Sequence, residues 1–156
     1  MSSFVIEAKE QDGILEFGFS GQIDEDASFD TANISAAKRV KINLENVSAI
    51  NSCGIREWIK WIKTASGAEE IVYQNCPKVI VDQINMVAGF LPENGRVESF
   101  YVPYYSEETD EEKMVLFKSG VEFSEGEVNP PGDVKDSSGE EMEMDIIEAK
   151  YFKFLK

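Results

Sequence analysis

Histidine is absent from this chain of 156 residues, and cysteine occurs only twice. Without histidine, the chain lacks the side chain that most often serves as a general base near neutral pH. The sequence also has no glycine-rich phosphate loop and no nucleophile beside a recognisable base, so we expect no enzymatic activity. Cys53 and Cys76 lie far apart and in no metal-ligand spacing, which favours two free thiols over a disulfide or a metal site.

Long hydrophobic runs and basic residues are also scarce. No apolar stretch approaches the ~20 residues that cross a bilayer, and the first ten residues lack the basic start and apolar core of a signal peptide. The 15 basic residues are outnumbered by 30 acidic ones, which gives a formal net charge of −15. Nucleic acid and anionic membranes repel such a polyanion. We therefore expect a cytoplasmic protein that binds neither.

The acidic residues do not indicate a metal site. Asp24-Glu25-Asp26 and the run 107–112 lack the glycine and the ligand spacing of a calcium loop, so we expect no metal or cofactor. Residues 101–156 hold 15 acidic and 6 basic residues, a net charge of −9. A hydrophobic content of 42% still indicates a globular chain rather than a disordered one. We expect one domain over residues 1–105 and an acidic β-hairpin extension, packed on or beside it, over residues 106–156.

Residues 40–66 are the most informative stretch and predict a strand followed by a helix. In the first part, apolar residues alternate with polar ones, the period of a strand with one buried face. From Ser52 the apolar residues recur every three or four positions, which predicts an amphipathic helix. Ser52 stands at the expected N-cap, where its hydroxyl would accept a hydrogen bond from a first-turn amide. The alternating residues are Val40, Ile42 and Leu44, and the helical ones are Ile55, Trp58, Ile59, Ile62 and Ala65.

A second strand–helix pattern covers residues 71–89, with Asn75 as the expected helix cap. Two helices that each follow a strand imply parallel strands with the helices on one face of the sheet. Upstream, residues 4–8 and 14–19 predict a hairpin, and residues 24–37 predict a short turn of helix and a loop. The predicted fold class is therefore α/β, a mixed sheet with helices packed on one face, plus a C-terminal β-rich appendage.

Three motifs occur in a definite order along the first hundred residues. The central one is the strand KINLENV followed by INSCGI, which opens the helix. Gly21-Gln22-Ile23-Asp24 precedes it, and Ile71-Val72-Tyr73, Asn75-Cys76-Pro77 and Gly89-Phe90-Leu91 follow it. In this order the motifs resemble the STAS domain of anti-sigma factor antagonists and of sulfate transporter tails. The resemblance covers roughly residues 4–102 and adds a STAS-like topology to the expected fold.

The resemblance implies a non-enzymatic protein-interaction module of bacterial signal transduction, with an anti-sigma factor or a serine kinase-like protein as its partner. In that family the serine at the position of Ser52 is phosphorylated by the partner kinase. Phosphorylated members usually carry Asp where this chain has Asn51, so a plain helix cap that contacts the partner is the favoured role for Ser52, and the phosphorylated switch is the alternative. The partner or phosphate site implied by the resemblance consists of Asp24, Asn51, Ser52, Cys53 and Gly54.

Other interpretations of the same helix remain open. Backbone N–H groups at a helix start can bind an anion, so a small-ligand or anion sensor is the alternative to the interaction module. Trp61 lies outside the apolar stripe, so an exposed Trp61 would mark a contact site, and Arg56 is a second candidate contact residue. Cys53 and Cys76 both follow neighbouring strands, which admits a redox pair, although two inert thiols are the simpler interpretation.

In the extension, four polar residues occupy the spacing of zinc knuckles. Ser106 and Thr109, then Lys135 and Ser138, resemble a zinc ribbon whose four cysteines have been replaced. None of the four can supply a thiolate, so we expect no structural zinc. Ordinary polar turns explain the spacing equally well, and the resemblance serves only to favour β structure. Strands are expected at 113–118, 121–123 and 141–147.

Overall fold

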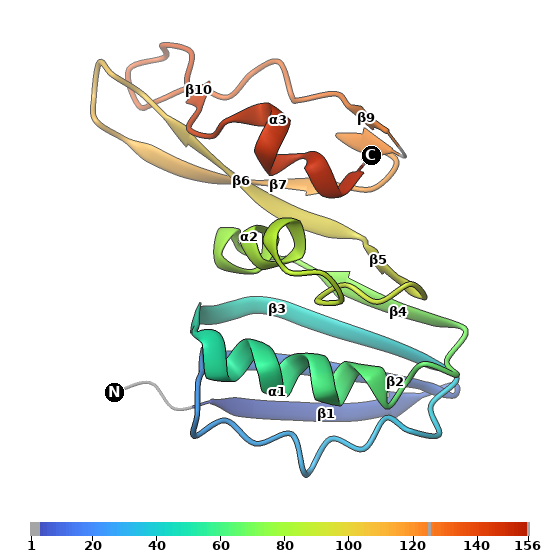
Figure 1. Ribbon diagram of the computed structural model, residues 1–156. Coiled ribbons are helices and arrows are strands. Elements are labelled where there is room, and N and C mark those ends of the chain that lie inside the picture. Colours follow the sequence, from blue (N-terminus) through green and yellow to red (C-terminus); the bar gives the residue numbers. More distant parts are fainter. Residues whose placement is uncertain (1–3, 125, 156) are drawn as a thin grey trace.

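The computed structural model describes residues 4–124 and 126–155, which form a five-stranded sheet, a three-stranded sheet and a small two-stranded sheet (Figure 1). The larger sheet consists of β1 (Val5–Gln11), β2 (Ile14–Ile23), β3 (Arg39–Ile50), β4 (Glu70–Gln74) and β5 (Gly95–Val97). The strands lie in this order across the sheet. β1 is antiparallel to β2, whereas β2 to β5 run parallel to one another. The sheet is therefore mixed, as predicted.

Both expected strand–helix units are present. Helix α1 (Ser52–Lys63) connects β3 to β4, and helix α2 (Lys78–Met86) connects β4 to β5. The prediction of two helices between parallel strands is confirmed. The expected cap of the second helix is wrong, because Pro77 rather than Asn75 is its N-cap. Trp58 of α1 and Ile80 of α2 belong to one buried cluster with the apolar residues of β3, whereas the polar Lys41 and Asn43 of β3 are only half-buried. In Figure 1, α1 lies along the length of the sheet.

Residues 24–37 differ from the expected short helix, because they form a series of bends and turns. The physical reason lies in their polar side chains. Asp24 and Asn33 each accept a hydrogen bond from the backbone amide two residues later, at 3.0 Å. Such local bonds compete with the backbone pattern of a helix. Phe29 and Ile34 nevertheless point into the core, so the loop covers one side of the sheet.

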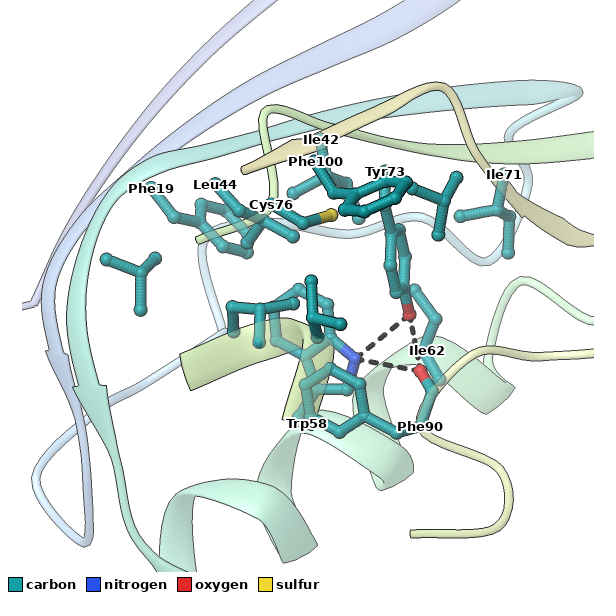
Figure 2. Packing of buried hydrophobic residues seen from close by; sticks show 14 of the residues in the cluster. Phe19, Ile42, Leu44, Trp58, Ile62, Ile71, Tyr73, Cys76, Phe90 and Phe100 are labelled. Atoms are coloured by element: carbon teal, nitrogen blue, oxygen red, sulfur yellow. Dashed lines mark hydrogen bonds between the residues drawn. The ribbon is translucent and has the colours of Figure 1, made fainter. Parts of the chain in front are cut away.

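The core of the larger sheet is aromatic and satisfies its own polar groups (Figure 2). Trp58 donates from Nε1 to the Tyr73 hydroxyl at 3.0 Å and to the Phe90 carbonyl at 3.3 Å. The Tyr73 hydroxyl in turn donates to the same carbonyl at 2.5 Å. Burial raises the pKa of Tyr73 well above its ordinary value, so this hydroxyl stays a neutral donor. The triad fixes α1 against β4 and against the segment that follows α2.

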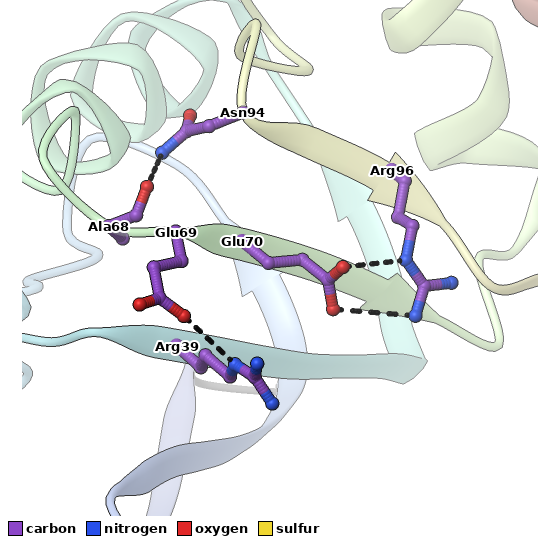
Figure 3. A network of polar contacts seen from close by, with 6 residues as sticks. All are labelled: Arg39, Ala68, Glu69, Glu70, Asn94 and Arg96. Carbon is purple, nitrogen blue, oxygen red and sulfur yellow. Dashed lines mark hydrogen bonds and ion pairs between the residues drawn. The ribbon is translucent and has the colours of Figure 1, made fainter.

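Polar contacts connect the segments where β3, β4 and β5 begin (Figure 3). Arg39 pairs with Glu69 at 3.3 Å, and Arg96 pairs with Glu70 at 3.2 Å. Both pairs are exposed and therefore contribute little to stability. Asn94 has a stronger role, because its amide donates to two carbonyls of the turn after α1, both at 3.0 Å. This turn sets where β4 begins, at the end of the molecule away from the start of α1.

The chain passes from the first sheet into a second one at Glu98, between β5 and β6 (Ser99–Tyr105). Cys76 joins the two sheets, because its amide donates to the Ser99 carbonyl and its carbonyl accepts from Tyr101. The second sheet has the order β10-β6-β7 and is antiparallel. Its other strands are β7 (Glu112–Lys118) and β10 (Glu143–Met144). A separate two-stranded sheet consists of β8 (Phe123–Ser124) and β9 (Glu127–Val128), and the last elements are helix α3 (Glu148–Tyr151) and the 3-10 helix η1 (Lys153–Leu155).

The extension is more irregular than its sequence pattern predicted. The strand expected at 113–118 is present as β7, but the one at 121–123 is reduced to β8, which pairs with β9. Of residues 141–147, only two form a strand, and the final residues are helical. The aromatic side chains of these final residues, Tyr151, Phe152 and Phe154, pack on Phe100 of β6. Buried residues of both sheets form one continuous cluster.

Candidate functional site

The start of α1 is built by Asn51, which is the N-cap residue. Its backbone is extended, and its side-chain Oδ1 accepts from the Gly54 amide at 2.9 Å. Ser52 had been expected at this position, and that expectation is wrong by one residue. Ser52 is instead the first residue of the helix and is exposed. The cap shifts because the Asn51 amide donates to the Ile23 carbonyl at 3.1 Å, which fixes where the extended chain ends.

Gly54 lies against the end of β2. A methyl group added at Gly54 would sit 2.0 Å from the Ile23 carbonyl oxygen, well inside van der Waals contact. Only glycine therefore allows α1 to begin this close to β2. The contact brings the residues after β2 and the first turn of α1 into one surface, as the sequence motifs had suggested.

Glu25 is the acidic residue that meets the helix start. Its Oε2 accepts from the Asn51 side-chain amide at 2.9 Å, and this hydrogen bond lowers the pKa of Glu25 below its ordinary value. Asp24, named from the sequence, is half-buried, and its carboxylate accepts from the Asp26 amide in a local turn. Sequence reasoning did not single out Glu25. The available signal was the acidic run 24–26, in which nothing distinguished one carboxylate from its neighbours.

A groove of about 650 Å³ opens between α1 and the loop 24–37. Cys53 and Arg56, both named from the sequence, line it on the helix side. The remaining lining includes charges of both signs. The charged residues are Glu25, Asp30, Glu57 and Lys60, and the uncharged ones are Ala27, Ser28, Phe29, Trp61 and Thr64. The start of α1 and this groove form one continuous surface, called the α1 surface below.

Trp61 is buried although it lies outside the apolar stripe, so it does not meet the condition for a contact site. Its side chain is only 7% exposed. The ring stacks on Phe29 with centroids 4.9 Å apart, and Nε1 donates to the Ala32 carbonyl at 2.6 Å. The loop 24–37 supplies both contacts, so the helical pattern alone could not place this residue. Trp61 contributes to the floor of the groove rather than to its rim.

The two cysteines are both free thiols. Cys76 is buried in the core, and burial raises the pKa of its thiol well above the ordinary value. Such a thiol is a poor nucleophile, because the thiolate is the reactive form. Cys53 is half-buried in the groove. The inert interpretation therefore fits Cys76.

Three of the four positions that resemble a zinc ribbon, Ser106, Thr109 and Ser138, come together around Asp136, which the sequence pattern did not single out. Asp136 is buried, and its Oδ2 accepts from the Ser106 hydroxyl at 2.5 Å and lies 3.5 Å from the Thr109 hydroxyl. Its Oδ1 accepts from the hydroxyl of Ser138 at 2.7 Å. Lys135 is exposed, and its backbone carbonyl accepts from the Lys113 side chain.

These hydrogen bonds place the pKa of Asp136 far below its ordinary value, because they stabilise the carboxylate. An ionised carboxylate thus links two turns that lie 30 residues apart. Within residues 4–124 and 126–155, no group of three or more histidine, cysteine or acidic residues is arranged to hold a metal ion. The expectation that the chain contains no structural zinc stays a prediction.

No family model matches this chain, and a search of curated proteins finds no match. Among the residues that the structure describes, no helix is both long and apolar enough to span a bilayer. The α1 surface is the candidate functional site of the described residues. That surface offers an exposed hydroxyl, mixed charges and an aromatic floor, which suit recognition of another molecule.

Proposed function

We propose that this chain is a STAS-like, non-enzymatic interaction module that binds a partner protein through the α1 surface. The observation that carries the proposal is the exposure of Ser52 at the first helical position, directly beside the Asn51–Glu25 hydrogen bond. The parallel strand–helix units support the proposal, since they bring together the motifs that resemble that family. By this resemblance, the partner is an anti-sigma factor or a serine kinase-like protein in the cytoplasm of a bacterium.

Phosphorylation of Ser52 is the proposed control. The side chain is exposed, so a kinase can reach it without unfolding the helix. A phosphate at a helix start is stabilised by the helix dipole, and it adds nearly two negative charges. Glu25 already contributes one negative charge beside the helix start. The added charge changes a mixed surface into an acidic one and abolishes docking of a partner that fits the unmodified form.

The alternative function, an anion or small-ligand sensor, has less support at this helix start. The Gly54 amide is already occupied by the side chain of Asn51. The Glu25 carboxylate lies against the same cap and repels a free anion. A covalently attached phosphate overcomes this repulsion because its attachment does not depend on affinity.

The test compares Ser52→Asp with Ser66→Asp, its matched control. Ser66 is an exposed serine just beyond the other end of α1 and outside the α1 surface. Both variants should keep the melting temperature and the far-ultraviolet circular dichroism spectrum of the unchanged chain. We expect the unchanged chain and Ser66→Asp to retain an anti-sigma factor or kinase-like protein of the native host, whereas Ser52→Asp loses at least tenfold in affinity, about 1.4 kcal/mol.

Equal partner binding by both variants would refute the switch. A host proteome in which Ser52 carries no phosphate under any growth condition would refute it as well. Failure of the unchanged chain to bind any such partner would contradict the proposed function itself. Binding of a small molecule at the α1 surface, detected after native purification, would favour the sensor instead.

A further inference from the structure

β7 forms an edge of the second sheet, because its only strand neighbour among the described residues is β6. The middle of β7 is apolar, and Met114 is 50% exposed. Leu116 and Met114 face the same side of the sheet as their cross-strand partners Tyr101 and Pro103. Free edges are usually protected by charged residues. β1, at the edge of the larger sheet, is protected in this way by exposed Glu7, Lys9 and Glu10, whereas the centre of β7 is not.

Two residues of β7 also direct their backbone N–H and C=O groups toward this free edge. In an antiparallel pair, residues opposite each other either exchange both hydrogen bonds or point both backbone groups away from each other. Pro103 has no amide hydrogen, and its carbonyl accepts from Asp145 on the β10 side. The Tyr101 amide likewise donates to Cys76, away from β7. The partners of these two residues, Met114 and Leu116, therefore direct their N–H and C=O groups outward.

The sequence of β7 is self-complementary when read against itself. With Val115 at the centre of a twofold axis, Met114 lies opposite Leu116, and Glu112 lies opposite Lys118. In this register, each residue whose backbone N–H and C=O groups point away from β6 lies opposite another such residue of the second copy. Glu112 and Lys118 are both exposed, and neither makes an ion pair with any residue that the structure describes. Each copy thus carries an unpaired acid and an unpaired base at the positions that a second copy would bring together.

We propose that β7 pairs antiparallel with β7 of a second copy, which joins two three-stranded sheets into one continuous sheet. The Met114 and Leu116 backbones supply the hydrogen bonds, and their side chains form an apolar contact beside Tyr101 and Pro103. The ladder ends at Lys118, because its amide donates to Glu122 and its carbonyl accepts from the following turn. This dimer surface lies on a different sheet from the α1 surface and does not depend on the proposed function.

The apolar contact is tested with Leu116→Lys and the control Met86→Lys. Met86 is 72% exposed on α2, so it offers an exposed apolar residue away from β7. The experiment is analytical ultracentrifugation from about 1 to 200 µM at 0.3 M NaCl, since salt screens the repulsion between two chains of net charge −15. We expect the unchanged chain and Met86→Lys to reach twice the monomer mass of 17.5 kDa, and Leu116→Lys to remain monomeric.

The pairing register is tested by charge reversal. Glu112→Lys places lysine opposite lysine, and Lys118→Glu places glutamate opposite glutamate, twice in each dimer. Each single variant should raise the dimer dissociation constant by roughly three- to tenfold, and the double variant should restore it. These changes lie on the exposed surface, so the fold, checked by circular dichroism, is retained. A monomeric unchanged chain, a dimer unaffected by Leu116→Lys, or a double variant as weak as the single ones would each overturn the proposal.

Discussion

At the scale of single residues, the approach of Gly54 to Ile23 decides where α1 can start. The position has no space for a side chain, because the atom in the way is a backbone oxygen that cannot rotate aside. Backbone displacement is then the only relief, and it would also disturb the Asn51–Ile23 hydrogen bond. The α1 surface therefore depends on one glycine more than on any of the polar residues around it.

Gly54→Ala should destabilise the protein by about 1–3 kcal/mol, because overpacking in a tight site forces the backbone to shift. Gly67→Ala is the matched control, since nothing lies within 4 Å of the methyl group added there. The free energy of unfolding from urea titration measures both. If Gly54→Ala were as stable as Gly67→Ala, the close contact with Ile23 would be wrong.

At the scale of the element, α1 owes its position to a cap at one end and to buried aromatic residues along its length. Trp58 and Trp61 are both buried and lie 5.3 Å apart between ring centroids. Two tryptophans on one helix anchor it to the sheet and to the loop 24–37 respectively. Asn51 adds the remaining constraint, because its side chain both accepts from the helix and donates to Glu25.

Asn51→Ala should cost about 1 kcal/mol of stability, the usual effect of removing a cap. Ser52→Ala should change stability by less than about 0.5 kcal/mol, because an exposed side chain that is not the cap contributes little. Thermal and urea unfolding at neutral pH measure the two variants side by side. A larger loss of stability in Ser52→Ala than in Asn51→Ala would show that Ser52 is the N-cap.

At the scale of the whole molecule, the second sheet is connected to the first by the step from β5 to β6 at Glu98, and the two sheets share one buried core. The tail after β7 ends over Phe100, and its middle part is fixed by Asp136. This carboxylate joins the turn after β6 to the turn at residues 136–140, where a zinc ribbon would use a metal. Closure of the extension therefore depends on an ionised group, and so on pH.

Asp136→Ala should lower the urea midpoint at pH 7, whereas Asp133→Ala, at an exposed position, should not. The folded pKa of Asp136 is depressed, so its contribution is complete above the unfolded value of about 3.9 and is lost as the pH falls below it. The difference in urea midpoint between the unchanged chain and Asp136→Ala should therefore decrease as the pH is lowered from about 5 to about 2. A difference that is constant with pH would contradict an ionised Asp136.

The sequence by itself determined β3, α1, β4 and α2, because the period of apolar residues is a local property that tells strand from helix. It also placed the candidate surface at the start of α1. Only the tertiary structure decided which residue caps that helix, since the cap depends on a hydrogen bond to Ile23 in another strand. The burial of Trp61 and the role of Asp136 were decided in the same way. Both depend on segments about 30 residues distant in the chain, whose contacts leave no local pattern in the sequence.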